Sequence, residues 1–196
     1  MPASERLTIE DLYSLEAYAK LRPEFRARVI EHKKHRRVPL GEHIVLLFED
    51  RLTIQYQIQE MLRIERIFEA AGIEEELAVY NPLIPDGSNW KATMTIEYPV
   101  EEERRTALAK FVGIENEVWV QVDGSGKVRA IADEDIERTT ETKTSAVHFL
   151  RFELTVAMVA ALKNGACLSA GVSHANYSCA VEMSPATHES LIADLD

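Results

Sequence analysis

The stretch Val118-Trp119-Val120-Gln121-Val122-Asp123-Gly124-Ser125-Gly126-Lys127-Val128-Arg129-Ala130-Ile131-Ala132 predicts a β-hairpin. Two runs rich in β-branched residues flank a turn built from Asp, Gly and Ser, the residues that tight turns favour. Further short runs typical of strands follow at 146–154, 168–172 and 177–181. Because short turns join antiparallel neighbours, we expect a mainly antiparallel sheet.

Helical patterns precede and interrupt these strands. Apolar residues recur at helical spacing over 53–71, which predicts the strongest helix of the chain, closed by Gly72. Pro23 fits the first position of another helix, and 101–112 has an amphipathic helical pattern. These runs indicate an α+β fold with the helices packed on one side of the sheet. No repeat or linker divides the chain, so we expect residues 1–196 to form a single domain.

Charge and hydropathy exclude two classes of partner. The net charge is −11, which opposes binding to nucleic acid or to an anionic membrane. No apolar run approaches the roughly 20 residues that span a bilayer, and residues 1–6 lack the apolar core of a signal sequence. We therefore expect a cytoplasmic protein. The basic run 32–37 suits a helix carboxyl terminus, with an anion-binding patch as the alternative.

The helix predicted over 53–71 carries acids near its apolar face. At about 100° per residue, Glu65 falls near the middle of the apolar arc, Gln57 lies within it and Glu60 lies at its edge. A buried carboxylate must be paired, hydrogen-bonded, protonated or metal-bound. One interpretation is an ion pair of Glu65 with an arginine, for which the candidates are Arg63, Arg66 and Arg151. The other is a carboxylate pair facing a pocket, with the candidate residues Gln57, Glu60, Glu65 and Arg151.

Histidines provide a second candidate site. Strand alternation over 146–154 points His148 toward an apolar layer, where it is either a satisfied core histidine or a ligand and proton shuttle. His174 lies where a strand gives way to a turn, and Glu97 lies on the threonine face of its strand. Carboxylates and imidazoles suit iron, manganese or zinc. The candidate metal ligands are therefore Glu65, Glu97, His148 and His174, although no metal-binding motif connects them.

Four stretches of the chain resemble a family of bacterial proteins known only as a domain of unknown function. The resemblance spans nearly the whole chain. The stretches are Leu21-Arg22-Pro23-Glu24-Phe25-Arg26, Gln57-Ile58-Gln59-Glu60-Met61-Leu62-Arg63, Tyr80-Asn81-Pro82-Leu83-Ile84-Pro85-Asp86-Gly87 and Ser145-Ala146-Val147-His148-Phe149-Leu150-Arg151-Phe152-Glu153-Leu154.

The resemblance implies a cytoplasmic, single-domain protein with no assigned activity. It also implies a redox or oxidative-stress context, because such genes accompany those for rubrerythrin-like proteins and iron–sulfur oxidoreductases of the heterodisulfide-reductase type. The first hypothesis is a non-catalytic accessory protein that binds an iron–sulfur oxidoreductase or a rubrerythrin-like partner. The alternative is a small metalloprotein or metal-dependent enzyme that uses Glu65 and His148.

Overall fold

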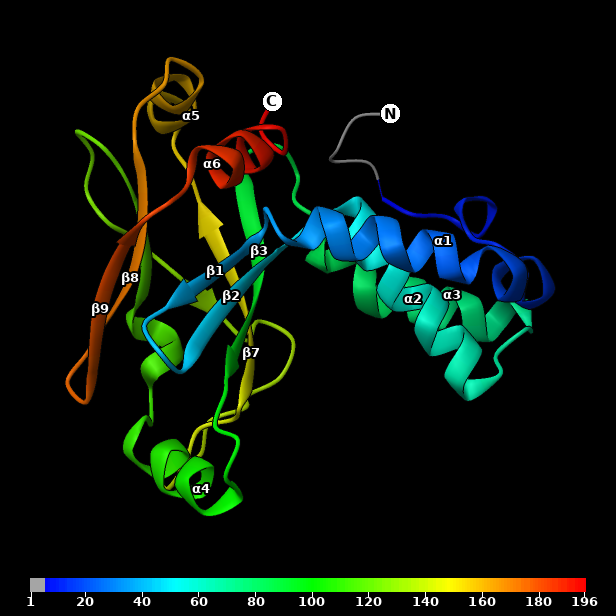
Figure 1. Cartoon of the computed structure of the whole chain (residues 1–196), viewed down its shortest axis with the longest axis horizontal. Coiled ribbons are helices and arrows are strands. Elements are labelled where there is room, and N and C mark those ends of the chain that lie inside the picture. Colours follow the sequence, from blue (N-terminus) through cyan, green and yellow to red (C-terminus); the bar gives the residue numbers. More distant parts are fainter. Residues whose placement is uncertain (1–5) are drawn as a thin grey trace.

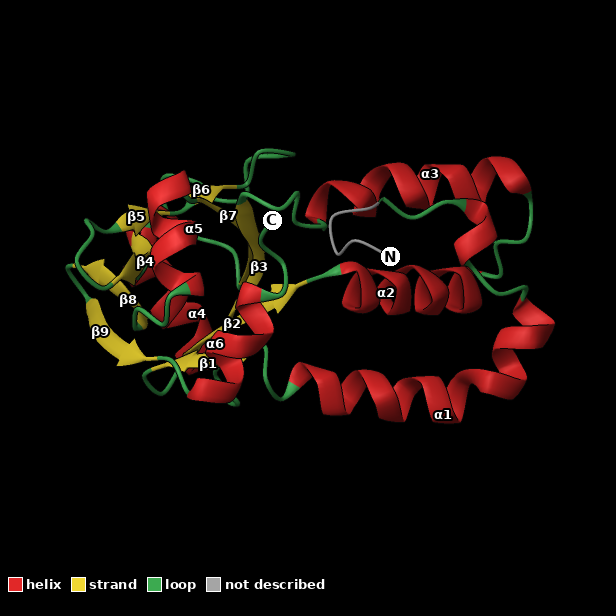
Figure 2. Ribbon diagram, turned by 90° about the horizontal axis from the view of Figure 1, so that it is seen from above, coloured by secondary structure: helices red, strands yellow, loops and turns green. Residues whose placement is uncertain are grey.

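The protein consists of a lobe of three helices beside a lobe of two β-sheets (Figures 1 and 2). The computed structural model describes residues 6–196, so residues 1–5, where we expect no signal sequence, lie outside the described part. The helical lobe contains α1 (Leu15–Lys33), α2 (Arg51–Glu65) and α3 (Ala70–Tyr80), preceded by the short helix η1 (Ile9–Asp11). The short helix η2 (Asn81–Leu83) leads from α3 back to the sheets.

Both sheets are antiparallel throughout, which confirms the predicted α+β class. The first sheet has the order β1-β2-β3-β7-β6, with β1 (Arg37–Leu40), β2 (Ile44–Glu49), β3 (Asn89–Ile96), β7 (Val147–Glu153) and β6 (Ile131–Ala132). The second has the order β5-β4-β8-β9, with β5 (Val128–Arg129), β4 (Val118–Val122), β8 (Leu168–His174) and β9 (Tyr177–Glu182).

The two sheets enclose one hydrophobic core. Burial along β3 alternates as expected for a strand with one buried face: Trp90, Ala92 and Met94 are buried, while Lys91 and Thr93 are only partly covered. Lys91 and Thr93 therefore lie on the outer face of the first sheet. The helical lobe covers part of this outer face, and that arrangement positions the cavities described below.

The shorter helices lie at the two ends of the sheets (Figure 1). α5 (Val156–Lys163) and α6 (Pro185–Ile192) lie at one end, and α4 (Glu101–Lys110) lies at the other, followed by η3 (Ile114–Glu117). The three long helices thus pack on one side of the sheets, while the short ones close the ends.

The predicted hairpin at 118–132 spans both sheets. β4 pairs with β5 in the second sheet, as expected, but β6 pairs with β7 in the first sheet. The crossing occurs at Ala130, which is buried and whose N–H still donates to the Val118 carbonyl at 2.9 Å. The hairpin therefore ties the two sheets together.

The single helix predicted over 53–71 is wrong, because two helices occupy the region. α2 ends at Glu65, Arg66 takes a left-handed conformation with φ 57°, and α3 begins at Ala70. The N–H groups of Arg66 and Ile67 both donate to the Leu62 carbonyl, so the chain folds back and returns Ile67 to the apolar cluster of the lobe. Gly72 lies inside α3, where a Cβ would come within 2.7 Å of the Ile67 side chain.

Pro23 does not begin a second helix; it lies inside the continuous α1. The buried residues Tyr18, Phe25 and Val29 lie on both sides of it and pack as one cluster. This packing outweighs the hydrogen bond that a proline removes from a helix interior.

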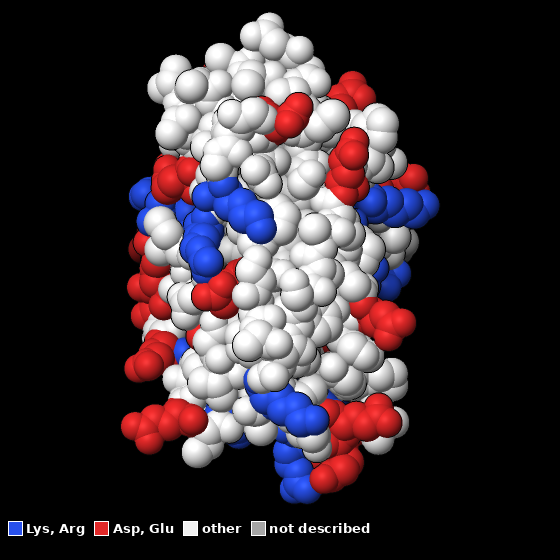
Figure 3. Space-filling view, turned by 90° about the vertical axis from the view of Figure 1, so that its left-hand side faces the viewer, with Lys and Arg blue, Asp and Glu red and all other residues white. Residues whose placement is uncertain are grey.

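Charged side chains are dispersed on the side of the molecule where β9 lies. Figure 3 shows that face with a largely uncharged centre and with acidic and basic residues mixed along its margins. Within residues 6–196, no helix is both long enough and apolar enough to cross a membrane.

Candidate functional site

The predicted carboxylate pair does not form. Glu65 is the last residue of α2 and is exposed, so its predicted inward orientation is wrong. Glu60 is mostly buried and belongs to a structural network instead. Its carboxylate accepts hydrogen bonds from Arg22 Nε at 2.7 Å, from the Tyr18 hydroxyl at 2.7 Å and from Arg63 at 3.1 Å. The Arg22 guanidinium lowers the pKa of Glu60 to about 2.

His148 does point inward, as predicted, and is fully buried. Its Nδ1 lies 2.6 Å from Asp133 Oδ2, and its Nε2 lies 2.8 Å from the Thr144 hydroxyl. Asp133 adopts a left-handed φ of 50°, and its other oxygen accepts the Phe149 N–H. His148 is therefore a hydrogen-bonded core histidine that fixes the start of residues 133–138, which we call the wall loop.

The four proposed metal ligands lie in separate places. Glu97 is half-exposed beside Arg37, and His174 lies at the end of β8 against the Val112 carbonyl. Glu65 lies in the helical lobe and His148 in the core of the sheets. Residues 6–196 contain no group of three His, Cys, Asp or Glu side chains that could hold a metal ion. The metal itself, whether iron, manganese or zinc, stays a prediction.

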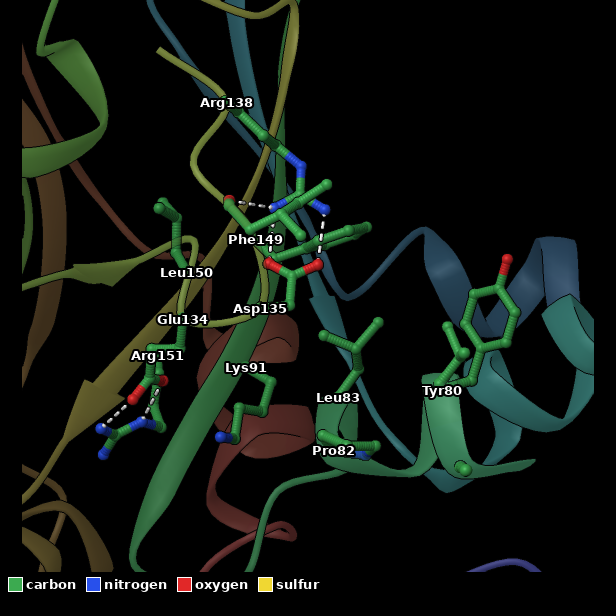
Figure 4. Close-up of a pocket in the computed structure, with 13 residues that line it drawn as sticks. Tyr80, Pro82, Leu83, Lys91, Glu134, Asp135, Arg138, Phe149, Leu150 and Arg151 are labelled. Atoms are coloured by element: carbon green, nitrogen blue, oxygen red, sulfur yellow. Dashed lines mark hydrogen bonds and ion pairs between the residues drawn. The ribbon is translucent and has the colours of Figure 1, made fainter. Parts of the chain in front are cut away.

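A cavity lies where the two lobes meet (Figure 4), and we call it the junction cavity. It has a volume of ≈ 720 Å³. The end of α3 and η2 form one wall with Tyr80, Pro82 and Leu83, and the wall loop forms the opposite one. Phe149 and Arg151 of β7 and Lys91 of β3 contribute from the outer face of the first sheet.

Two arginines of this cavity are neutralised by neighbouring acids. Arg138 binds both oxygens of Asp135, at 2.5 and 2.6 Å, and its guanidinium lies 4.6 Å from the centre of the Phe149 ring. This fork lowers the pKa of Asp135 to about 2. Arg151 binds both oxygens of Glu134, each at 2.7 Å, and also contacts Glu153. These pairs rigidify the walls.

Lys91 differs from both arginines. Within residues 6–196, no hydrogen bond or ion pair holds its ammonium group, although the side chain is half-buried and lines the cavity. Burial lowers the pKa of Lys91, and Arg151, its cross-strand partner, lowers it further. Glu134, Asp86 and Glu153 act in the opposite direction from a distance, so Lys91 lines the junction cavity without a directly bound carboxylate among the described residues.

A second, smaller cavity adjoins the first, and we call it the inner cavity. It has a volume of ≈ 270 Å³ and shares Tyr80, Leu83 and Phe149 with the junction cavity. Glu49 of β2, Gln57 of α2 and Thr93 of β3 also line it. Two residues of the predicted pocket therefore line cavities, Gln57 the inner one and Arg151 the junction one, whereas Glu60 and Glu65 line neither.

Sequence reasoning missed Lys91 and Glu49. Strand alternation carries the signal for both: Lys91 shares a face with Thr93 and Thr95, and Glu49 shares one with Val45 and Leu47. That this face borders a cavity depends on how η2 packs against β7, and no local pattern encodes such packing.

The fold and its cavities define an α+β protein with a ligand-sized space between two lobes. A family model described as "Protein of unknown function (DUF3501)" matches residues 6–195. The chain belongs to this family.

A solved structure shares the fold. It is the crystal structure of a novel protein of unknown function from Burkholderia pseudomallei K96243, and its sequence is 57% identical to this chain. The match covers 98% of this chain and 100% of the other, with a TM-score of 0.93. No curated protein matches the chain.

Proposed function

We propose that this protein acts by binding, and that the junction cavity holds a small organic anion with an apolar body. The observation that carries the proposal is the half-buried Lys91, which lines a cavity of ≈ 720 Å³ and whose ammonium has no hydrogen bond or ion pair within residues 6–196. Ligand sites are typically concave, mostly apolar spaces with a few polar groups that fix orientation. This cavity matches that description.

The charge arrangement favours an anion. Lys91 is directly opposed to Arg151 on β7, and like charges so placed destabilise a sheet; on its other side it is opposed to Glu49 of β2, with which it forms no ion pair within residues 6–196. Glu134 and Glu153 pair with Arg151 and act on Lys91 only at longer range, so the Lys91 ammonium has no carboxylate at ion-pair distance within residues 6–196. A bound carboxylate would supply the missing partner and would favour the charged form of the lysine.

The apolar walls favour a ligand with a hydrocarbon body. Tyr80, Pro82 and Leu83 lie on one side of the cavity, and Phe149 lies on the sheet side (Figure 4). Burying apolar surface contributes about 0.8 kcal/mol per methylene group, so a medium-chain carboxylate gains several kcal/mol here.

The test is calorimetric titration with octanoate. We expect saturable binding to one site, weakened at least about tenfold by Lys91→Met, because a half-desolvated charge pair is worth about 1.4 kcal/mol or more. The matched control is Lys163→Met, which removes an exposed lysine of α5 far from the cavity. Binding that is absent, or that both variants weaken equally, would contradict the proposal.

A binding role also accommodates the context that the family resemblance implies. We propose that the protein is a cytoplasmic, non-catalytic accessory protein in redox or oxidative-stress metabolism, with an iron–sulfur oxidoreductase or a rubrerythrin-like protein as partner. Tagged protein purified from its native host under reducing conditions should co-elute with such a partner. If neither kind of protein is recovered, this context is unsupported, whereas the octanoate result stands on its own.

A further inference from the structure

The inner cavity contains a charge that complements Lys91. Glu49 is only 7% exposed, and its two carboxylate oxygens accept hydrogen bonds from the hydroxyls of Thr53 and Thr93, each at 2.6 Å. Within residues 6–196 no cation forms an ion pair with it. Glu60 of α2, which accepts a hydrogen bond from the Tyr18 hydroxyl of α1, by contrast binds two arginines.

A buried carboxylate that only neutral hydroxyls satisfy is poorly compensated. Removing a carboxylate from water costs several kcal/mol, and a nearby cation offsets that cost far better than two hydroxyl groups. An ammonium group in the inner cavity would supply this cation and would also fill part of the ≈ 270 Å³ of space beside Glu49.

Glu49 and Lys91 lie near each other but face different cavities. They occupy paired positions on β2 and β3, both on the outer face of the sheet. Glu49 turns toward Thr53 at the start of α2, whereas Lys91 lines the junction cavity. Tyr80, Leu83 and Phe149 line both cavities and so connect the two spaces.

We propose that the ligand is an elongated zwitterion. Its carboxylate binds Lys91 in the junction cavity, its ammonium group binds Glu49 in the inner cavity, and its apolar body crosses Tyr80, Leu83 and Phe149. This inference rests on the proposed binding function and specifies the chemical class of the ligand.

Lys33 is the cation that lines the inner cavity itself. Lys33, at the end of α1, has its ammonium 5.8 Å from the centre of the Tyr56 ring and forms no ion pair with Glu49. Glu49 therefore stays available to bind the ammonium group of a ligand. Replacing Lys33 also tests whether Lys33 or Lys91 binds the carboxylate of the ligand.

The experiment compares three probes of equal length by calorimetric titration: 8-aminooctanoate, octanoate and octylamine. With the native chain, 8-aminooctanoate should bind at least about tenfold more tightly than octanoate, since it adds one buried charge pair. Glu49→Gln should remove this advantage and weaken octylamine binding at least about fivefold, while octanoate binding changes less than about twofold.

Three results would overturn the inference. The first is equal affinity of the native chain for 8-aminooctanoate and octanoate, which needs no variant and so holds even if Glu49→Gln unfolds. The second is octylamine binding that Glu49→Gln leaves unchanged. The third is a tenfold loss of 8-aminooctanoate binding in Lys33→Met, which would assign the carboxylate to Lys33 instead of Lys91.

The same titrations separate this inference from the binding function on which it rests. If octanoate binds through Lys91 but the amino group adds nothing, the anion site stands and the zwitterion is wrong. If octanoate does not bind but octylamine binds through Glu49, the ammonium site stands and the anion function is wrong.

Discussion

Two groups of charged residues lie against the helical lobe. In the first group the charges form ion pairs with one another, and in the second group, within the described part of the chain, they do not. Where α1, α2 and α6 meet, Arg36 is 1% exposed and binds Asp194 at 2.5 Å. His32 lies 2.5 Å from Asp50, which also lies 3.5 Å from Arg36. At the junction and inner cavities, in contrast, Lys91 and Glu49 form no ion pair within residues 6–196.

The difference separates charges that hold the fold from charges available to a ligand. Arg36 also donates to the Phe48 and Glu49 carbonyls and so joins α6 to β2. Burial nevertheless raises the pKa of Asp194 to about 6, which shows how strongly desolvation acts even beside an arginine. A buried charge without such a partner is harder to explain by stability alone.

The largest expected effect comes from removing the cation of the satisfied group. Arg36→Met should lower the free energy of unfolding by about 3–5 kcal/mol, because Asp194 is then left buried without a counter-ion. Urea unfolding measures this. The matched control is Arg37→Met, whose pair with Glu97 is half-exposed on both sides and should contribute about 0–1 kcal/mol. Equal losses in both variants would contradict the distinction drawn between the two groups.

A smaller effect is expected at Glu60. Glu60→Ala should lower the free energy of unfolding by about 1–3 kcal/mol at pH 7, because the buried Tyr18 hydroxyl loses its charged acceptor.

The same residue makes stability depend on pH. The folded pKa of Glu60 is lowered to about 2 from its ordinary value of 4.5, so its contribution is full above pH 4.5 and is lost as pH falls toward 2. Unfolding curves between pH 7 and pH 3 should therefore converge for the native chain and Glu60→Ala. If the difference in unfolding free energy between the two proteins stays constant with pH, the pairing of Glu60 with Arg22 makes no net contribution to stability.

The smallest expected effect has the opposite sign. Lys91→Met should raise the free energy of unfolding by about 0.2–1 kcal/mol, because it removes a half-desolvated cation opposite Arg151. The loss of octanoate binding should accompany this gain, as expected where a site retains charge at the expense of stability. Lys91→Arg keeps the charge and should show no gain. A loss of stability in Lys91→Met would assign Lys91 a structural role.

Sequence patterns predicted the strands better than the helices. Strand alternation correctly predicted that the His148 side chain points inward, because the period of two along a strand holds wherever one face is buried. The prediction that Glu65 points inward was wrong because it required α2 to continue. The backbone instead reverses at Arg66, and Ile67 packs against the apolar cluster. A helical arc predicts burial only as far as the helix and its neighbours extend.

The candidate site was less predictable than the fold. Gln57 and Arg151 were expected in one pocket and line two adjoining cavities, both of which are bordered by Leu83 of η2 and Phe149 of β7. Local sequence patterns do not predict the packing of these two elements. The metal and the redox partner remain predictions, since both depend on molecules outside the chain.

The position of α2 and α3 in the chain has one more consequence. They lie between β2 and β3, two strands that are hydrogen-bonded neighbours and that a tight turn would ordinarily connect. The two helices are thus an insertion at the tip of a hairpin, and their apolar cluster is distinct from the core between the sheets. Residues of this insertion that line the cavities can consequently vary during evolution, and with them the ligand, while the sheets retain their own interior.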